Sequence, residues 1–302
     1  MSNIYLDDRM YGKADVRLLH VRRETRFHHV VHELRCRVLM RLASEIDFVT
    51  GDNRDIVATD TTKNTVFALA KKVGVTSAEQ FALAISKHYF DQYKHIEAMD
   101  VSIDETRWTR VQTSEQPKPH SHAFINAREC VRTISVTQTR GQQPVLTSGI
   151  KELEIMKTTQ SGFEGYIKDE YTTLKPTADR VFRTVVSCQY TFDPANVHSI
   201  DYEAVFQTAR DAILSEFAGP SEQGVYSPSV QNTIYLAQKR IIDRVAAVSR
   251  VTIEMPNRHC ILVDLSPFKL QNNNEVFVVT GEPAGLIRAS MSRLGSSIKS
   301  KL

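Results

Sequence analysis

Twice along the chain, apolar residues change from alternating with polar ones to recurring at helical spacing. This pattern constrains the fold more than any other feature of the sequence. Apolar and polar residues alternate over residues 34–42 and again over 182–192, a pattern typical of strands with one buried face. Each alternating segment precedes apolar residues at helical spacing, within 61–96 and within 202–245. More strand-like runs follow each helical region. The pattern predicts an α+β fold, in which an antiparallel sheet carries helices on one face.

The two halves of the chain resemble each other, which favours duplication of a strand, strand, helix, helix, strand, strand unit. The helix openings TTKNTVF at 61–67 and SVQNTIY at 229–235 both hold Asn-Thr, then a β-branched residue and an aromatic ring, although so short a match also fits coincidence. We expect two units, residues 1–140 and 141–302, with self-association covering the free sheet face. In the first half we expect strands 16–21 and 34–42, a helix from Thr61, a helix from Ser77, and strands 101–111 and 130–136. Ser77 and Gln80 fit a capping box. In the second half we expect strand 182–192, helix 202–217, a helix capped by Ser227, and a hairpin of strands 251–255 and 260–265.

The composition argues against several classes of protein. The 302 residues include 38 basic and 35 acidic side chains, a net charge of +3 without a long basic stripe, so we expect no nucleic-acid partner. No apolar run approaches the ~20 residues of a membrane span, and we expect no membrane partner. The four cysteines lie far apart without a C-x-x-C pair, which argues against a disulfide framework or a zinc knuckle.

The last three residues, Ser300, Lys301 and Leu302, spell SKL. This ending is the tripeptide that the peroxisomal import receptor binds. A solvated tail without a role is the alternative. The sequence therefore predicts that the chain is located in the peroxisome and that the import receptor is one of its partners.

No familiar cofactor motif is present in the sequence: G-x-G-x-x-G, G-x-x-x-x-G-K-[ST] and H-E-x-x-H are all missing. His120 and His122 in KPHSHAF could bind a metal from a strand, but no third ligand with clear spacing accompanies them. The alternative is a polar loop with hydrogen-bonded histidines, and we expect no metal. Ser227 and Ser229 lack the context of a hydrolase nucleophile.

Polar residues gather at two predicted helix openings. In VATDTTKNTV, residues 57–66, helix capping by Asp60, Thr61 or Thr62 is the simplest interpretation. The free N–H groups of a helix opening also form a natural anion site. Near the second opening, Arg180 offers a two-pronged donor, Gln231 an amide and Phe163 a stacking face. Together these three groups would hold a flat, anionic heterocycle.

The sequence resembles the urate oxidase (uricase) family over nearly its whole length. The motifs that carry the resemblance are YGKADVRL, VATDTTKNTV, HSHAF, GFEGYIKDEYTTLKPTADR, SVQNT, MPNRH, NNNEVF and the SKL ending. The resemblance implies two tandem tunnelling-fold units per chain and a homotetramer that encloses a tunnel or barrel. It also implies oxidation of urate by dioxygen and water to 5-hydroxyisourate and hydrogen peroxide, without a metal or organic cofactor.

The same resemblance assigns roles to individual residues. It implies that the proton relay falls on Lys13, Thr59 and His259. It implies that Arg180 and Gln231 bind urate as a pair, with further contacts from the backbone N–H groups of Val230 and Asp60. Phe163 then lies beneath the ring and Leu174 in the pocket wall. Asn257 holds dioxygen or water above the ring, and Thr59 contacts both urate and the dioxygen or water. The motif MPNRH differs mildly from the family, which often has Leu and Lys where this chain has Met255 and Arg258.

A base is needed because urate must lose a proton before it can give electrons to dioxygen, which accepts them one at a time. Lys13 acting through Thr59 could take that proton if burial or nearby charge deprotonates its ammonium group. Whether Lys13 or His259 is the final acceptor stays open. Since Lys13 and Thr59 lie in the first half and Arg180 in the second, the resemblance implies active sites shared between subunits.

Two other functions fit parts of the pattern. The first is a purine or pterin binder that keeps the urate-binding pair without turnover, which loss of Lys13 or Thr59 would favour; both residues are present. The second is another tunnelling-fold enzyme that acts on pterins. That enzyme would need a zinc or glutamate constellation, which the sequence does not show.

Overall fold

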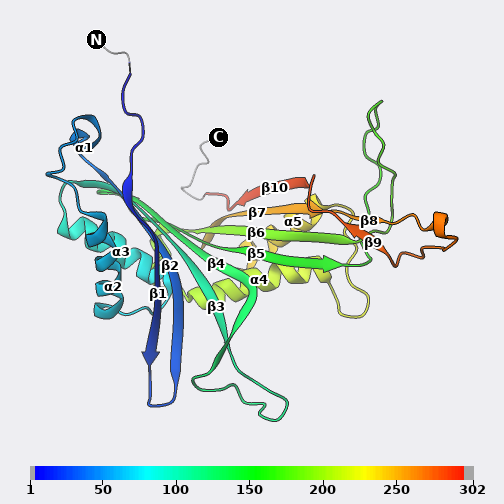
Figure 1. The fold of residues 1–302 in the computed structure, drawn as a ribbon, viewed down its shortest axis with the longest axis horizontal. Helices are drawn as coiled ribbons and strands as arrows, with labels where there is room; N and C mark the ends of the chain where they lie inside the picture. The colour runs from blue at the N-terminus through cyan, green and yellow to red at the C-terminus, as the bar shows by residue number, and fades with distance from the viewer. Residues whose placement is uncertain (1–3, 296–302) are drawn as a thin grey trace. The chain divides into compact units, whose positions relative to one another are not determined.

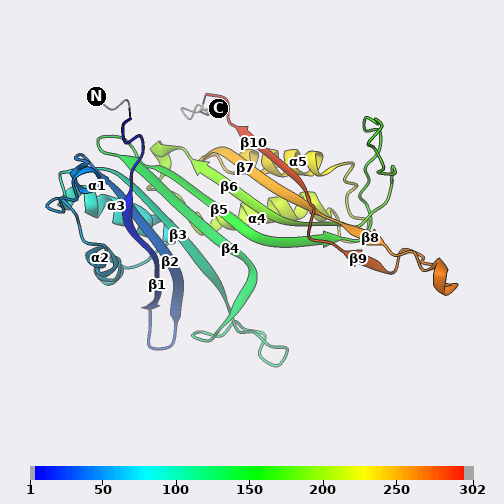
Figure 2. The same ribbon diagram turned by 45° about the horizontal axis from the view of Figure 1, so that its top comes forward.

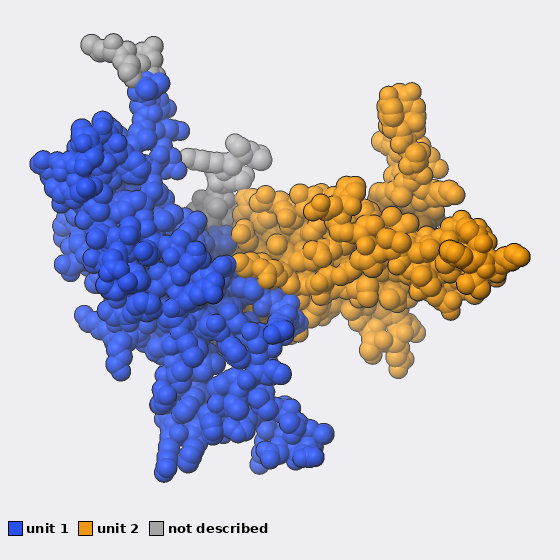
Figure 3. Space-filling view, viewed as in Figure 1, with its two compact units in different colours: residues 1–149, 191–203 blue, residues 150–190, 204–302 orange. Residues whose placement is uncertain are grey.

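The computed structural model describes residues 4–295 (Figures 1 and 2). The chain forms two compact units, drawn in different colours in Figure 3: unit 1 holds residues 1–149 and 191–203, and unit 2 holds 150–190 and 204–302. The division expected from the sequence, at residue 140, stays a prediction. The SKL ending, Ser300, Lys301 and Leu302, lies outside the described residues.

Unit 1 contains an antiparallel sheet with the strand order β1-β2-β3-β4. Helices α2 and α3 pack on one face of this sheet, α2 against β1 and α3 against β3 and β4 (Figure 1). The elements are β1 (Tyr11–Arg23), β2 (His29–Leu42), α1 (Ile46–Val49), α2 (Thr59–Lys72), α3 (Ala78–Gln92), β3 (Ile96–Arg110), β4 (Phe124–Thr139) and the 3-10 turn η1 (Pro194–Asn196).

Unit 2 repeats this scheme with the strand order β5-β6-β7-β10, and α5 packs on β7 and β10. A separate two-stranded sheet pairs β8 with β9. The elements are β5 (Val145–Lys157), β6 (Phe182–Phe192), α4 (Tyr202–Ala218), α5 (Val230–Arg244), β7 (Val248–Arg258), β8 (Cys260–Leu262), the 3-10 turn η2 (Ser266–Phe268), β9 (Phe277–Val279) and β10 (Gly285–Ser292). The predicted α+β class, antiparallel with helices on one face, is confirmed.

The alternating segments form the buried centre of each sheet. On β2, five alternate residues from Leu34 to Leu42 are no more than 2 % exposed, and on β6 Phe182, Cys188 and Phe192 are fully buried. Burial of each large apolar side chain contributes roughly 1.5–3 kcal/mol. Period-two patterning therefore located the core strands correctly.

The predicted cap of α3 is confirmed, and that of α5 is wrong by two residues. Ser77 accepts a hydrogen bond from the Gln80 backbone N–H at 3.1 Å. The cap of α5 is Ser229, which accepts from the Asn232 N–H at 3.2 Å, whereas Ser227 was expected. The Ser227 hydroxyl is buried instead and accepts a hydrogen bond from Thr233.

The predicted hairpin across PNRH is also wrong. Strand β7 continues through Pro256, Asn257 and Arg258 and pairs with β10, where Asn257 lies opposite Gly285. The buried alternation of Val251, Ile253 and Met255 extends to Asn257, and none of the PNRH residues takes the positive φ that a tight turn often needs. Strand 260–265 shortens to β8 and pairs with β9, while strand β5 was not predicted.

Candidate active site

Three segments of unit 2 meet at the opening of α5. The Gly162 N–H donates to the Ser227 carbonyl at 3.0 Å, and the Arg180 N–H donates to the Ser161 carbonyl at 2.8 Å. Phe163 pairs with Thr177, donating its N–H to the Thr177 carbonyl at 2.8 Å. These backbone bonds bring the segments that carry Phe163, Arg180 and the first turn of α5 together.

Arg180 has an unfilled donor beside an aromatic face. Its guanidinium carbon lies 5.4 Å from the centroid of the Phe163 ring, which stacks at 4.9 Å on Tyr166. The Arg180 Nε atom is buried and has no hydrogen-bond partner among residues 4–295. Burial also lowers the pKa of the guanidinium group. A buried donor without an acceptor is costly, so the site is built for an acceptor from outside the chain.

The first turn of α5 offers further donors. Its cap Ser229 uses its hydroxyl for the Asn232 N–H and its carbonyl for the Thr233 N–H. The N–H groups of Val230 and Gln231 therefore have no acceptor within the described chain, as is usual in a first helical turn. Val230 is buried and the Gln231 side chain is exposed. An anion beside Arg180 would meet these N–H groups at the positive end of the helix dipole.

The remaining predicted residues of unit 2 lie on separate segments. Asn257 is 9 % exposed on β7, and His259 follows that strand, with its carbonyl accepting from the Thr280 N–H at 3.0 Å. Leu174 is 57 % exposed, and its carbonyl accepts from the Tyr166 hydroxyl at 2.6 Å. In the part of the chain that is described, no side-chain hydrogen bond joins Leu174, Asn257 or His259 to Arg180.

Unit 1 opens helix α2 in a different way from the sequence prediction. The helix begins at Thr59 after Ala58, which makes no side-chain cap, so capping by Asp60, Thr61 or Thr62 is wrong. The Asp60 carboxylate accepts from Lys63 Nζ at 2.5 Å and from Asn64 Nδ2 at 3.0 Å. The Thr59 hydroxyl is exposed and does not cap the helix, so it can bind a ligand next to the uncapped N–H groups of the first turn.

Lys13 lies near this helix opening. The Tyr11 hydroxyl accepts from the Val57 N–H at 2.9 Å, which ties the start of β1 to the segment that enters α2. The hydrogen bond from Lys63 holds the pKa of Asp60 below its usual range, and the charge of Lys13 adds a smaller effect in the same direction. Within residues 4–295, however, no direct hydrogen bond joins Lys13 to Thr59.

Backbone geometry fixes where Lys13 can lie. A Cβ atom on Gly12 would lie 1.9 Å from the Val38 carbonyl oxygen on β2, so only glycine fits there. The register of β1 with β2 then shifts between Lys13 and Val16, and Asp15 has a positive φ of 56°. This β-bulge redirects the chain immediately after Lys13, a device that often aims a side chain at a functional site.

Comparison with known proteins accounts for this arrangement. The family model described as Uricase matches residues 9–137 and 146–288. This chain belongs to the uricase family. It is 40 % identical over 283 residues to the uricase of Danio rerio, covering 94 % of this chain and 93 % of that protein. It is likewise 40 % identical to the uricase of Dictyostelium discoideum over 294 residues, covering 97 % and 99 % of the two chains.

Solved structures agree with the sequence comparison. The crystal structure of the uricase from Arthrobacter globiformis matches with a TM-score of 0.89 at 33 % identity, and the match covers 99 % of both chains. A uricase from Bacillus fastidious shares the fold with a TM-score of 0.75 at 22 % identity. The sheet and helix arrangement described above is therefore that of uricases.

Family residues expected from the sequence divide between the two compact units. Lys13, Thr59 and Asp60 belong to unit 1. Unit 2 holds Phe163, Leu174, Arg180, Val230, Gln231, Asn257 and His259. Each unit therefore carries part of the predicted uricase site. Thr59 and Asp60 lie in the first turn of α2 in unit 1, and Val230 and Gln231 lie in the first turn of α5 in unit 2.

Lys157 is a residue near the candidate uricase site that the sequence analysis missed. It ends β5, and its Nζ donates to the Val225 carbonyl and to the Ser227 hydroxyl, both at 2.8 Å. Burial lowers the pKa of Lys157 to about 8. Strand β5 was not predicted, and the partners of Lys157 lie far away in the sequence, so no local signal pointed to this residue.

The predicted metal alternative at His120 and His122 is not supported by the local geometry. These residues lie in the loop before β4 and not on a strand, and the His120 Nδ1 atom accepts from the backbone N–H groups of His122 and Ala123. Within residues 4–295, no group of three or more His, Cys, Asp or Glu side chains is arranged to hold a metal. The two rings contact each other at 4.6 Å.

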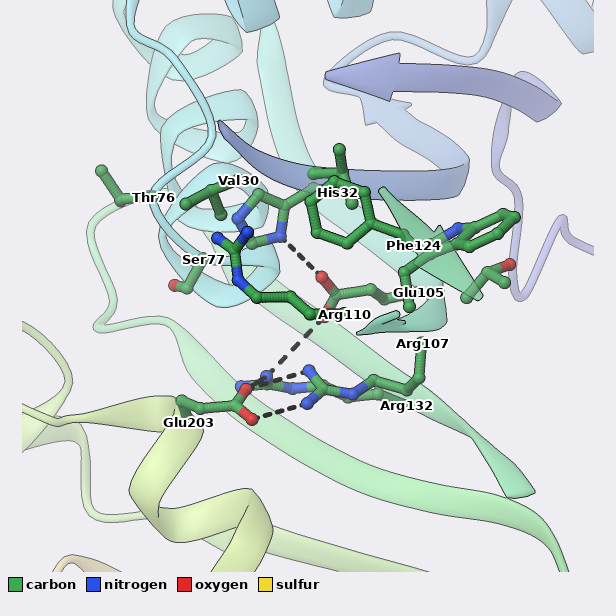
Figure 4. Close-up of a pocket in the computed structure, with 13 residues that line it drawn as sticks. Val30, His32, Thr76, Ser77, Glu105, Arg107, Arg110, Phe124, Arg132 and Glu203 are labelled. Carbon is green, nitrogen blue, oxygen red and sulfur yellow. Dashed lines mark hydrogen bonds and ion pairs between the residues drawn. The ribbon is translucent and has the colours of Figure 1, made fainter. Parts of the chain in front are cut away.

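Unit 1 contains a cavity of 310 Å³, and none of the predicted uricase residues lines it (Figure 4). In its wall, His32 Nδ1 lies 2.6 Å from Glu105 Oε1, and Arg132 donates to Glu203 at 2.9 Å. Burial alone would raise the pKa of Glu105, but the hydrogen bond from His32 and the charge of Arg132 hold it below its usual range. This network joins side chains of β2, β3 and β4 to Glu203 at the start of α4.

Proposed function

We propose that this chain catalyses the oxidation of urate by dioxygen and water to 5-hydroxyisourate and hydrogen peroxide, without a metal or organic cofactor. The observation that carries the proposal is the buried, unpartnered Nε atom of Arg180 beside the Phe163 ring and the open first turn of α5. Membership of the uricase family supports the same substrate. The reaction balances: one urate, one dioxygen and one water give one 5-hydroxyisourate and one hydrogen peroxide.

Binding follows from the groups at the opening of α5. Urate is flat and anionic, so one edge with two acceptors suits the forked donor of Arg180. The Val230 N–H and the Gln231 amide would add hydrogen bonds, and Phe163 would stack beneath the ring. In this arrangement Leu174 closes the pocket wall, and a neighbouring subunit supplies the Asp60 N–H to the anion.

Chemistry then requires removal of a proton and transfer of electrons to dioxygen. Lys13, acting through the Thr59 hydroxyl, and His259 would hold or pass on the proton lost by urate. Asn257 would hold dioxygen, and later water, above the ring. Electrons pass from the urate dianion to dioxygen and leave a peroxide on ring carbon five. Departure of this peroxide as hydrogen peroxide lets water add at the same carbon.

The assembly that completes each site is a homotetramer of tunnelling-fold chains in which neighbouring subunits share active sites. The division of the predicted residues between unit 1 and unit 2 supports sharing, because Lys13 and Thr59 belong to one unit and Arg180 to the other. Exposed apolar side chains on β1, β4 and β10, namely Leu19, Ile125 and Leu286, agree with a sheet face covered by another copy.

The place of action is the peroxisome, reached through Ser300, Lys301 and Leu302. A reaction that releases hydrogen peroxide is suited to that compartment. Deletion of these three residues should leave the activity of the purified protein unchanged and should move the protein to the cytosol. Continued peroxisomal import of the shortened chain would contradict the proposal.

Ultraviolet absorbance of urate over time tests the reaction. We expect decay of the urate band in air, one peroxide released per urate, unchanged decay after exhaustive chelation, and no decay without dioxygen. Loss of activity after chelation, restored by a single metal ion, would contradict cofactor-free catalysis. Tight binding of urate without any decay would instead show a purine-binding protein.

A further inference from the structure

Lys157 holds an unusual position behind the candidate urate site. Its ammonium group makes no ion pair with a carboxylate in the described part of the chain, and it donates to two neutral oxygens, the Val225 carbonyl and the Ser227 hydroxyl, both at 2.8 Å. On another side, Nζ lies 5.4 Å from the centroid of the Phe217 ring. Burying a lysine halfway without a carboxylate partner lowers the free energy of unfolding. The position of Lys157 therefore needs an explanation other than stability.

Ser227, the acceptor of this lysine, joins the segments of the site. Its N–H donates to the Gln160 carbonyl at 2.9 Å, and its own carbonyl accepts from the Gly162 N–H at 3.0 Å. Its hydroxyl accepts from the Thr233 hydroxyl of α5 at 3.0 Å. The segment that leads to Phe163 and the first turns of α5 are therefore both attached to a residue that Lys157 holds.

The charge of Lys157 also adds to the positive electrostatic potential at the opening of α5. Helix α5 presents its positive end where the Val230 and Gln231 N–H groups are free, and Lys157 adds a full positive charge on the Ser227 side of that end. Burial lowers the pKa of Lys157 to about 8, with no carboxylate to counter it. An anion at the helix opening would relieve the repulsion among these positive groups.

We propose that Lys157 is a positioning residue of the urate site, which holds the opening of α5 against the Phe163 segment through Ser227 and strengthens the attraction of that opening for an anion. The inference rests on the proposed function, because the anion in question is urate at Arg180. Lys157 touches no reacting atom. Its effect should therefore appear in the binding of urate before it appears in the chemical step.

A double-mutant cycle tests this role. The variants are Lys157→Met, Ser227→Ala and the double variant, with Lys157→Arg to restore charge. Lys239→Met is the matched control, because exposed Lys239 lies on α5 and pairs with Asp243. For each variant one measures the Kd of an unreactive azapurine analogue, and KM and kcat for urate. We expect about a tenfold rise in Kd and KM for Lys157→Met, with kcat changed less.

The pattern among the variants decides the proposal. Partial recovery of Kd in Lys157→Arg, unchanged Kd in Lys239→Met and a double variant no weaker than the worse single variant would support it. Equal Kd values for Lys157→Met and Lys239→Met, or fully additive effects of Lys157→Met and Ser227→Ala, would overturn it. If Lys157→Met does not fold, Ser227→Ala and Lys157→Arg still decide, since an unchanged Kd in Ser227→Ala rules out action through that hydroxyl.

Failure of this inference can be told apart from failure of the proposed function. If the unaltered protein neither binds the azapurine nor consumes urate, the proposed function itself is wrong. If the unaltered protein does both and Lys157→Met behaves like the control, only the role of Lys157 is refuted.

Discussion

The guanidinium carbon of Arg180 lies 5.4 Å from the centroid of the Phe163 ring, and the backbone N–H of Arg180 is bonded to Ser161, two residues before that ring. The side chains of both residues are thus fixed by the same short stretch of backbone. Stacking and hydrogen bonding to a ligand would be set together at this point. The relationship suggests how to separate binding from catalysis by mutation.

Replacing Arg180 by lysine should weaken binding of urate, because a single ammonium group cannot reproduce the forked donor. Loss of one charge-assisted hydrogen bond of about 1.5–3 kcal/mol corresponds to a rise in Kd of about ten- to a hundredfold. Isothermal titration with an azapurine analogue measures it. Arg183→Lys is the control, since Arg183 bonds Glu154 on β5; a Kd unchanged in Arg180→Lys would make Arg180 structural.

Thr59→Ala should mainly lower kcat and change KM little, because it interrupts the expected proton relay while the urate-binding pair Arg180 and Gln231 stays in place. The helix should tolerate the change, since Ala58 and not a hydroxyl occupies the cap position. Thr61→Ala, on the same exposed turn, should match the unaltered protein in both constants. Steady-state kinetics in which Thr59→Ala raises only KM would show that Thr59 merely binds urate.

Mixed assemblies of two mutant chains should reveal whether subunits share active sites, as proposed. A chain with Lys13→Met and Thr59→Ala is co-expressed with a chain carrying Arg180→Gln and Gln231→Ala, and mixed assemblies are purified by two tags. Shared sites should regain a fraction of normal turnover, because some interfaces then combine two intact halves. Mixtures of two chains that both carry Arg180→Gln serve as the inactive control. A stable but inactive mixture of the first kind would place each site within one chain.

Glu79→Gln should destabilise unit 1. One Glu79 oxygen accepts hydrogen bonds from both Arg132 and Ser148, and the Glu79 and Arg132 side chains are no more than 3 % exposed. Weakening a buried pair on one side costs about 3 kcal/mol or more. Asp91→Asn, which removes an exposed pair with Lys87, should leave the free energy of unfolding nearly unchanged. Urea unfolding compares the two, and equal midpoints would refute the prediction.

Stability should rise with pH through the titration of Lys157. Burial lowers the pKa of Lys157 in the folded state to about 8 from 10.5. Between these values the unfolded chain binds more protons than the folded one, so the free energy of unfolding increases with pH. Relative to Lys157→Met, the unaltered protein should gain stability from about pH 8 to 10.5 and show a constant difference below pH 8. A difference that falls over that window would contradict the sign of the shift.

Local sequence patterns predicted the elements better than their ends. The alternation of Leu34, Val38 and Met40 reports burial directly, and it located β2 because one face of the strand is covered. The cap of α5 could not be assigned from sequence, since Ser227 and Ser229 are equally good capping residues. Tertiary contacts decide between them: Thr233 and Lys157 occupy the Ser227 hydroxyl.

Residues of the candidate site were predicted from family motifs, and local rules misjudged how some of them are held. Capping rules expected a hydroxyl or carboxylate to open α2, but the Tyr11 hydroxyl from β1 fixes the entry at Val57 instead. Such a contact joins residues far apart in the sequence, so no local pattern reports it. Lys157 was missed for the same reason, because its partners Val225 and Ser227 come about seventy residues later.

The partners of Arg132 set an order of events for a chain that is still being synthesised. This buried arginine of β4 bonds the Tyr202 carbonyl at 3.0 Å and the Glu203 carboxylate at 2.9 Å, which follow β5 and β6 in the sequence. When the ribosome has made only the first 140 residues, Arg132 lacks these acceptors. Glu79 is then its partner in the nascent chain, and the full set of bonds to Arg132 forms only after β5 and β6 have emerged. The edge of β6 that pairs with β7 stays open until β7 has been made.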